Sequence, residues 1–496
     1  MEQYFLAIDQ GTTSTRAILF TVDGQIREVA AAEHRQYHPQ PGWVEHSAEE
    51  IWSNTSQVIE NVMTAAEVEL EQLLALGITN QRESVVFWDR ETREPLTPVI
   101  VWQDSRTQDW LDEHSDTLSA EVKKRSGLPL TAYFSASKIS WLLRHDPDLA
   151  DRAKRGEVCV GTMDTWLLHN LTGGEVFATD VTNASRTMLY NLQEDQWDET
   201  LCQLFEIPAE ILPQIRPSAG DFGTVTMPEC IAGVKITAIL GDQQAAAFGQ
   251  HAVSAGQTKN TYGTGCFLLQ NTGTEIPSSE HGLIPTVAYQ IGDQPRSFAL
   301  EGSIAVAGSA LQWLRDQVQL VPDTETLVEV AASVDDTGGV YFVPAFSGLY
   351  APYWDTNARG LLIGMTGYTT NAHILRAALE STAYQSVDVL TALADSTGQD
   401  LESIKVDGGM AVNDQLLQFQ ADLLNVPVQR PTVIETTARG AALAAGLGVG
   451  HFTDLEDLAE LWQLDTEFSP SMDPEERAEL LRYWHRAIER TRNWLG

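Results

Sequence analysis

Two segments, one at the start of the chain and one just past its middle, share a plan that limits the folds open to this sequence. Tyr4 to Phe20 reads as two apolar strands around a polar turn at Asp9 to Arg16. Thr258 to Gln270 reads the same way around the turn Gly263 to Cys266. The two segments share little sequence identity, so the similarity is one of plan. Each half of the chain is therefore expected to open with a strand, a small-residue turn and a second strand.

Strand-like and helix-like segments alternate along the rest of the chain. Asp23-Gly24 is a hairpin signal before a third short strand. Ser47 and Glu50 have the spacing of a capping box, and an apolar helical face follows them. Further strands are expected at Leu76 to Thr79 and Ser84 to Trp88, and further helices at Gln243 to Phe248, Ala372 to Ala394 and Asp414 to Leu424. This alternation predicts an α/β fold rather than an all-α or all-β fold.

The chain has 496 residues, more than one small core needs, so two or more domains are expected. We place a boundary near Gln250, after the helix predicted at Gln243 to Phe248. This divides the chain into an N-terminal domain, residues 1–249, and a C-terminal domain, residues 250–496. No low-complexity linker marks the join, which favours two lobes that meet at a cleft.

The charge balance argues against two classes of partner. Lys and Arg total 31 against 69 Asp and Glu, for a formal net charge of -38. Such a chain repels phosphate backbones and anionic lipid headgroups, so neither nucleic-acid binding nor stable membrane association is expected. The longest run of small apolar residues, Gly440 to Gly450, is too short to span a bilayer.

Two further features predict a cytoplasmic protein. The N-terminus begins Met1-Glu2 and carries Asp9 in its first apolar stretch, unlike a signal peptide. The chain has 4 cysteines, none in a C-x-x-C arrangement, which argues against a disulfide framework or a zinc site.

The acidity itself has two interpretations. Only 7 of the 31 basic residues are lysine, and an acid-rich surface that holds water and cations suits a salty cytoplasm. An ordinary acidic enzyme from a GC-rich genome has the same composition. Salt dependence of stability separates the two interpretations.

The first turn offers groups that can hold phosphate. Gly11 allows close backbone approach, and Thr12 to Thr15 supply hydroxyl and N–H donors. Asp9 can orient a hydrated Mg²⁺ ion, and Arg16 can neutralise charge on a moving phosphoryl group. A polar hairpin without a ligand would use the same residues. The segment is not a Walker A loop, because it lacks the Gly-Lys-Ser/Thr sequence.

The second turn strengthens the phosphate interpretation. Gly263 to Cys266 supplies one such turn in the second half, and two turns can clasp a polyphosphate from both sides. Because the net charge repels ATP, local N–H groups, hydroxyls and Mg²⁺ have to bind it. Gly408-Gly409 could let the backbone lie flat against an adenosine. It also suits a simple strand-to-helix turn with Asn413 near the helix start.

A small polyol could be bound where two polar clusters follow predicted strands. Arg82 can donate to a hydroxyl, Glu83 can accept from one, and Asp242 is the candidate base that takes a proton during attack. A surface ion pair for Arg82 and Glu83, and a helix cap for Asp242, are the structural alternatives. Aromatic residues that could line the carbon edge of a polyol are Trp102, Tyr133 and Phe267.

Taken together and in order, these segments resemble the FGGY carbohydrate kinases, and among them those that act on glycerol. The resemblance runs from Ile8 to Pro470. It is carried by Pro41 to His46, Gly77 to Glu83, Val101 to Gln103, Tyr133 to Ser135 with Lys138 and Trp141, Thr182 to Met188, Gly241 to Ala246, Asn260 to Phe267 and Ala351 to Asp355.

The resemblance implies a two-lobed fold of the actin/hexokinase/Hsp70 type with the ligand cleft between the lobes. Residues 1–249 would bind glycerol and phosphate, and residues 250–496 the nucleotide. The implied reaction is ATP-dependent phosphorylation of glycerol to sn-glycerol 3-phosphate by in-line transfer, with Mg²⁺ and with Asp242 as general base. Arg16 and Asp9 would also act in catalysis, Asp9 holding Mg²⁺ through water. Homodimers or homotetramers are common in the family.

The implied binding residues can be given position by position. Glycerol would be held by Arg82, Glu83, Trp102, Tyr133, Asp242, Gln243 and Phe267. The nucleotide would be held by Thr12, Thr13, Ser14, Arg16, Thr264, Gly308, Gln312, Gly409 and Asn413.

The chain departs from the family at two places. Met227 to Lys235 stands where some relatives carry a Gly-x-Arg loop for fructose 1,6-bisphosphate, and it holds no phosphorylatable histidine. Tyr350 stands where relatives usually have glycine.

The alternative functions are a kinase for another polyol or sugar, such as xylulose, ribulose or gluconate, and an ATP-gated binding module on the same scaffold. The second would leave the polyol-site residues without a role.

Overall fold

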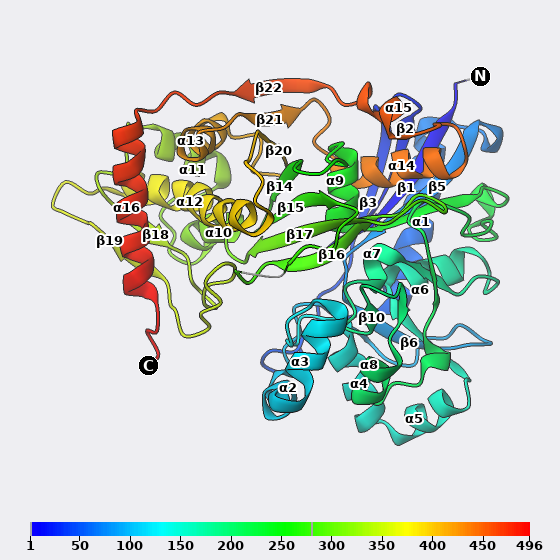
Figure 1. Cartoon of the computed structure of the whole chain (residues 1–496). Helices are drawn as coiled ribbons and strands as arrows, with labels where there is room; N and C mark the ends of the chain where they lie inside the picture. Colours follow the sequence, from blue (N-terminus) through cyan, green and yellow to red (C-terminus); the bar gives the residue numbers. More distant parts are fainter. Residues whose placement is uncertain (1, 279–280) are drawn as a thin grey trace.

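Two large sheets organise the molecule in the computed structural model, which describes residues 2–278 and 281–496 (Figure 1). The first sheet has the strand order β13-β5-β1-β2-β3. Its strands are β1 (Tyr4–Gln10), β2 (Ser14–Thr21), β3 (Ile26–Glu33), β5 (Leu73–Asn80) and β13 (Ile236–Gly241).

The second sheet repeats the plan of the first and extends it. Its order is β16-β17-β15-β14-β20-β21-β22. Its strands are β14 (Thr258–Tyr262), β15 (Cys266–Gly273), β16 (Ile284–Tyr289), β17 (Ser297–Ile304), β20 (Ile404–Asp407), β21 (Val428–Pro431) and β22 (Leu464–Phe468). In both sheets an antiparallel hairpin, β1–β2 or β14–β15, is joined by a parallel strand, β5 or β20. The expected repeat of plan and the α/β prediction are confirmed.

Four strands of the first sheet, β13, β5, β1 and β2, are buried on both faces, which explains their apolar sequences, whereas the edge strand β3 is largely exposed. Alternate residues of β1 enter two different cores: Tyr4, Leu6 and Ile8 lie in one, Phe5 and Ala7 in the other. The first core is completed by helices α1 (Ala48–Ala66) and α6 (Met163–Leu171), the second by α9 (Asp242–Gly249) and α14 (Thr436–Gly448).

Helix α14 is far from the first sheet in sequence but packs directly on it. Figure 1 shows the orange α14 beside the blue β1 and β5. A Cβ atom at Gly77 of β5 would lie 2.2 Å from the carbonyl oxygen of Ala441, and one at Gly440 would lie 1.8 Å from that of Ala245 in α9. Only glycine permits these contacts, so small residues let α14, α9 and the sheet approach closely.

The remaining elements surround the two sheets. A four-stranded sheet has the order β4-β7-β6-β8, and three strand pairs are β9–β12, β10–β11 and β18–β19. Their bounds are β4 (Glu45–His46), β6 (Val85–Asp89), β7 (Val99–Ile100), β8 (Val158–Thr162), β9 (Ala178–Asp180), β10 (Tyr190–Asn191), β11 (Gln196–Trp197), β12 (Gln214–Arg216), β18 (Tyr341–Val343) and β19 (Leu361–Ile363). The other helices are α2 (Gln108–Glu113), α3 (Ser115–Ser126), α4 (Ser135–His145), α5 (Pro147–Lys154), α7 (Val181–Ala184), α8 (Glu199–Leu204), α10 (Gly308–Asp316), α11 (Thr324–Ala332), α12 (Asn371–Thr397), α13 (Asp414–Leu424), α15 (Leu455–Ala459) and α16 (Pro474–Thr491).

Two local predictions need correction. The first turn is shorter than expected, because Asp9 lies inside β1 and Ser14 to Arg16 lie inside β2, where Arg16 pairs in register with Asp9. Ser47 caps α1, since its Oγ accepts from the backbone N–H of Glu50 at 3.2 Å, but the Glu50 carboxylate accepts from Arg35 N instead of closing the capping box. Among the described residues no helix is long and apolar enough to cross a membrane.

Candidate active site

The first turn holds a charged triplet at the end of the β1–β2 hairpin. Arg16 donates from Nη2 to Asp9 and from Nη1 to Oε2 of Glu435, the latter at 2.7 Å. Asp9 is almost fully buried, and burial raises the pKa of its carboxyl although Arg16 opposes the shift. Glu435 directly precedes α14, so this ion pair joins the two halves of the chain. Sequence reasoning did not identify Glu435, because its partner lies in the other half.

The second turn meets two other predicted nucleotide-binding segments. The backbone N–H of Gly308 donates to the Gly263 carbonyl at 3.1 Å, and those of Ala307 and Ser309 donate to the Thr264 carbonyl. A Cβ atom at Gly308 would lie 2.7 Å from Gly263 O and 3.1 Å from Sδ of Met410. The structure therefore brings the Gly263 turn, the start of α10 and the Gly408 turn together.

The other predicted nucleotide residues lie on neighbouring elements. Gln312 is exposed on α10, and Gly409 is exposed in the turn after β20. Asn413 is the N-cap of α13, where its side chain accepts from Leu416 N. The prediction that Asn413 lies at a helix start is therefore confirmed. In the first turn, the Ser14 and Thr13 carbonyls accept from Gly11 and His34.

The predicted acceptor residues Arg82, Glu83 and Asp242 form one cluster. Arg82 Nε lies 3.1 Å from Oδ1 of Asp242 and 3.8 Å from Oε1 of Glu83. The side chains of Arg82 and Glu83 are 2% exposed, against 31% for Asp242. A surface ion pair is thus the wrong interpretation of Arg82 and Glu83, and Asp242 is the accessible carboxylate of the three.

The backbone next to this cluster has an unusual conformation at Glu83 and no room for a side chain at Gly241. Glu83 has a φ of 65°, an uncommon value for a side-chain-bearing residue and one that recurs at functional sites. A Cβ atom at Gly241 would lie 2.7 Å from Cδ of Arg82, so glycine is needed before Asp242. Asp242 is the first residue of α9, and its Oδ1 accepts from the backbone N–H of Gln243 at 2.7 Å.

The cluster also contains two buried residues, Arg186 and Glu301, which sequence reasoning did not assign to it. Arg186 donates from Nε to Oε1 of Glu83 at 2.7 Å and from Nη2 to Oε1 of Glu301 at 2.9 Å. Glu301 also accepts from Nη1 of Arg82 at 2.5 Å. The available signal was a charged residue inside an apolar strand, since Glu301 stands in the β17 sequence Phe298 to Ile304. Arg82 Nε and Arg186 Nη1 have no hydrogen-bond partner among the described residues.

Trp102, one of the predicted aromatic residues, contacts the first turn and packs against a second, Tyr133. Trp102 and Tyr133 meet edge to face with ring centroids 5.6 Å apart, and Trp102 Nε1 donates to the hydroxyl of Thr12 at 3.0 Å. This contact joins the acceptor residues to the first turn. Lys138, fully buried, donates to the carbonyls of Ala132, Tyr133 and Phe134 and so fixes the segment that carries Tyr133.

Gln243 and Phe267, the last two predicted acceptor residues, are linked by Lys259. The Lys259 ammonium donates to Oε1 of Gln243 at 2.6 Å, to Oγ1 of Thr261 at 2.9 Å and to the Phe267 carbonyl at 3.1 Å. Gln243 is the second residue of α9 and Phe267 lies in β15, so this buried lysine holds residues of both halves.

Accessibility and pKa together make Asp242 the carboxylate most suited to accept a proton. Burial raises the pKa of the Asp242 carboxyl, while Arg82 and Lys259 lower it and Glu301 raises it. Burial raises the pKa of the Glu83 carboxyl as well, but that side chain is only 2% exposed, against 31% for Asp242. In contrast, the two arginines outweigh burial at Glu301 and lower its pKa to about 2. Glu301 therefore stays charged, and a raised pKa gives Asp242 more basic character.

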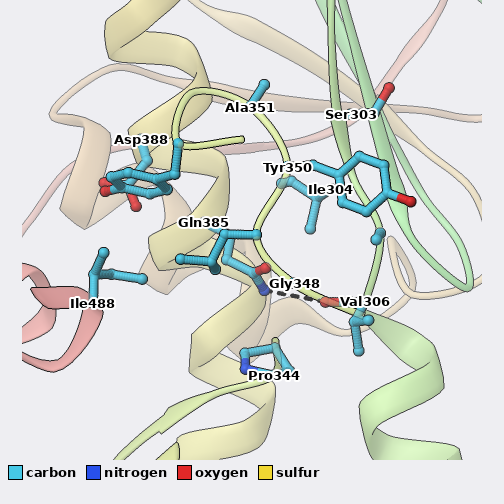
Figure 2. A pocket seen from close by; sticks show the side chains of 13 residues that line it. Ser303, Ile304, Val306, Pro344, Gly348, Tyr350, Ala351, Gln385, Asp388 and Ile488 are labelled. Atoms are coloured by element: carbon cyan, nitrogen blue, oxygen red, sulfur yellow. Dashed lines mark hydrogen bonds between the residues drawn. The ribbon is translucent and has the colours of Figure 1, made fainter. Parts of the chain in front are cut away.

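A separate hollow lies in the second lobe, between the 344–353 loop, α12 and α16 (Figure 2). Tyr350, Asp388 and Ile488 line it, and Gln385 Nε2 donates to the Val306 carbonyl at 3.1 Å on its floor. It contains none of the predicted site residues.

Comparison with known proteins adds independent findings. Residues 4–249 match the profile of the N-terminal domain of the FGGY family of carbohydrate kinases, and residues 258–449 match that of its C-terminal domain. The chain is 51% identical to a glycerol kinase from Renibacterium salmoninarum, over 100% of this chain and 99% of the relative. It is 51% identical to one from Nocardia farcinica, over 100% of both chains.

A solved structure agrees with the fold. The crystal structure of Plasmodium falciparum glycerol kinase with ADP superposes with a TM-score of 0.92 at 37% identity, covering 99% of this chain and 98% of that one. The matched regions span both sheets and the segments that form the candidate site. The two-lobed fold expected from the resemblance is confirmed, and the chain belongs to the FGGY family of carbohydrate kinases.

Proposed function

We propose that this protein transfers the γ-phosphoryl group of ATP to the 3-hydroxyl of glycerol, yielding sn-glycerol 3-phosphate and ADP. The observation that carries this function is the cluster of the buried Arg82 and Glu83 with the more accessible Asp242. Trp102 lies between this cluster and the first turn, since its backbone N–H donates to Ser84, next to Glu83, and its ring N–H donates to Thr12. Relatives named glycerol kinase at 51% identity over the full chain support this function.

The cluster has the donors and acceptors that a small polyol needs. Arg82 Nε, which faces Asp242 at 3.1 Å without a hydrogen bond of good geometry, can donate to one glycerol hydroxyl, and Glu83 can accept from another. Trp102, Tyr133 and Phe267 would cover the carbon atoms, and Gln243 would contact a further hydroxyl. In this arrangement the attacking hydroxyl lies against Asp242.

In the transfer itself, Asp242 takes the proton from the 3-hydroxyl while that oxygen bonds to the γ-phosphorus. The bond from the γ-phosphorus to the bridging oxygen breaks, and ADP leaves with that oxygen. Arg16 would stabilise charge on the phosphoryl group, a role that requires it to exchange its contact with Glu435 for one with phosphate. Positioning and charge stabilisation supply most of the acceleration.

The nucleotide would be bound by the two turns and by the segment from Gly408 to Asn413. Mg²⁺ would enter with ATP, because the described residues contain no group of three or more metal-binding side chains. The buried carboxylate of Asp9 would hold that ion through water. Phosphate oxygens would supply the remaining ligands.

Location and assembly follow from the proposed reaction and the family. The use of ATP as a substrate and the presence of four free cysteines both suit a cytoplasmic protein. We infer a homodimer or homotetramer from the family resemblance. The division into domains at residue 250 also remains our proposal. Helix α14 belongs to residues 250–496 but packs on the first sheet, which residues 1–249 form.

Product analysis tests this function. Purified protein is incubated with MgATP and glycerol, and the product is identified by phosphorus NMR and by oxidation with a dehydrogenase specific for sn-glycerol 3-phosphate. We expect stoichiometric sn-glycerol 3-phosphate and ADP. Release of inorganic phosphate alone, or a phosphate ester of another acceptor only, contradicts the proposal.

A further inference from the structure

We propose that Glu301 and Lys259, two buried charged residues of the second sheet, are positioning residues for the acceptor site. Glu301 fixes Arg82 and Arg186, and Lys259 fixes Gln243 and the Phe267 backbone. The inference rests on the proposed function, and it means that the acceptor site is complete only when both lobes pack as they do here.

Strand register explains how the two charges reach the same site. Lys259 of β14 pairs with Leu269 of β15, and Leu269 pairs with Glu301 of β17. Residues paired across strands point to the same face of a sheet. Neighbouring strands are about 4.8 Å apart, so Lys259 and Glu301 stand roughly 10 Å apart on that face. Helix α9, which begins with Asp242 and Gln243, contacts β14 and β15 (Figure 1).

Glu301 serves as a bridge between two guanidinium groups of the other half. Its Oε2 accepts from Arg82 at 2.5 Å and its Oε1 accepts from Arg186 at 2.9 Å, with its side chain fully buried. Arg186 in turn donates to Glu83 at 2.7 Å. Loss of this carboxylate would therefore free both arginines, and through Arg186 it would loosen Glu83.

Lys259 makes the matching link at α9. All three ammonium protons have acceptors: Gln243, Thr261 and the Phe267 carbonyl. Because the ammonium occupies Oε1 of Gln243, the amide NH₂ is left as the group that can meet a hydroxyl. The chain has 7 lysines, and this is one of two that are completely buried, the other being Lys138.

The charges of the cluster balance. Arg82, Arg186 and Lys259 carry positive charge, and Glu83, Glu301 and Asp242 carry negative charge. Removing one member of such a buried set leaves an uncompensated charge, which is far more disruptive than removing a surface pair. The effect should fall on glycerol binding, because the hydrogen bonds of these two side chains go to acceptor-site groups and Thr261, and to no predicted nucleotide residue.

Steady-state kinetics of Glu301→Gln and Lys259→Met test the proposal. Gln keeps the size of Glu but turns an NH₂ group toward one of the arginines. We expect each variant to raise the KM for glycerol by about tenfold or more while the KM for ATP stays within about twofold. Matched controls are Glu380→Gln and Lys405→Met, which remove a buried acid paired with Arg376 and a lysine that pairs with Lys259 across the sheet. Both controls should keep the wild-type KM for glycerol.

The pH profile supplies a readout that general loss of stability would not move. Around Asp242, Glu301 acts to raise the carboxyl pKa, whereas Arg82 and Lys259 act to lower it. The acid limb of kcat/KM should therefore shift to lower pH in Glu301→Gln and to higher pH in Lys259→Met. We expect each shift to be about half a pH unit or more.

The outcomes separate cleanly. An unchanged KM for glycerol in both variants, or shifts of the acid limb in the same direction, would overturn the proposal. If Glu301→Gln does not fold, Lys259→Met alone decides: an unchanged KM for glycerol, or an acid limb that does not move to higher pH, would overturn the proposal. If the wild-type protein shows no glycerol-dependent turnover, the proposed function fails instead, and the measurement distinguishes the two failures.

Discussion

At the scale of single residues, the candidate chemistry depends on Asp242 at the start of α9. Its carboxylate is the exposed member of a cluster whose other charged groups are buried, and Arg82 Nε lies 3.1 Å away. The proton acceptor Asp242 therefore lies beside an N–H group of Arg82 that can donate to a hydroxyl. A hydroxyl nucleophile requires such a pair of groups.

Asp242→Asn removes the proposed base but keeps the size of the side chain. We expect kcat to fall about 100- to 10,000-fold, the usual contribution of a general base, with little change in the KM for glycerol. The exposed Asp335→Asn is the control and should keep wild-type turnover. Near wild-type kcat in Asp242→Asn would exclude Asp242 as the base.

The raised pKa of Asp242 also predicts the pH dependence of the wild-type protein. The base works only when ionised, so activity should disappear as pH falls through its pKa. Because burial raises that pKa, the loss should begin at a higher pH than an ordinary aspartate, about 3.9, would give. The measurement is kcat/KM against pH at saturating MgATP. An acid limb at or below the ordinary value would contradict the assigned environment.

The members of the candidate acceptor site that could be predicted are those that share a short segment, such as Arg82 with Glu83 and Asp242 with Gln243. Residue type and position at a strand end were enough to select them. Glu301, Lys259 and Glu435 were missed because their partners come from the other half of the chain. Strand register and lobe packing, which no local pattern encodes, bring them to the site.

At the scale of elements, α14 joins the two halves of the molecule by close contact through glycine. Gly440 faces the Ala245 carbonyl of α9, and a Cβ atom there would lie 1.8 Å from that oxygen. The sequence predicted helices at the positions of α9, α12 and α13. The packing of α14 on the first sheet could not be predicted, because its small residues have no periodicity that identifies a partner.

Gly440→Ala should therefore force α14 away from α9. Overpacking of this kind typically costs about 1–3 kcal/mol, so we expect a lower thermal midpoint. Gly367→Ala is a suitable control, because no atom lies within 4 Å of the added Cβ. Equal midpoints for the two variants in calorimetry would show that the helices can separate freely.

At the scale of the whole molecule, two sheets of related plan each carry one of the two predicted phosphate-binding turns, and the chain has a formal net charge of -38. The repeat could be predicted from two turn-containing hairpins, because apolar runs broken by small residues identify themselves. The acidic surface bears on stability, since like charges repel one another in the folded state and salt screens that repulsion.

Screening should therefore stabilise the protein. We expect the thermal midpoint to rise by several degrees between dilute buffer and molar KCl. Differential scanning calorimetry across that range, with sucrose as a nonionic control, makes the measurement. A flat midpoint would favour the ordinary acidic enzyme over adaptation to a salty cytoplasm.

The most direct test of the account is ADP release from MgATP with glycerol, without acceptor, and with a panel of pentuloses and sugar acids, each at low and molar KCl. We expect strong ADP release with glycerol and with no other acceptor. Strong release with another acceptor, or release that no acceptor stimulates at either salt concentration, would contradict it.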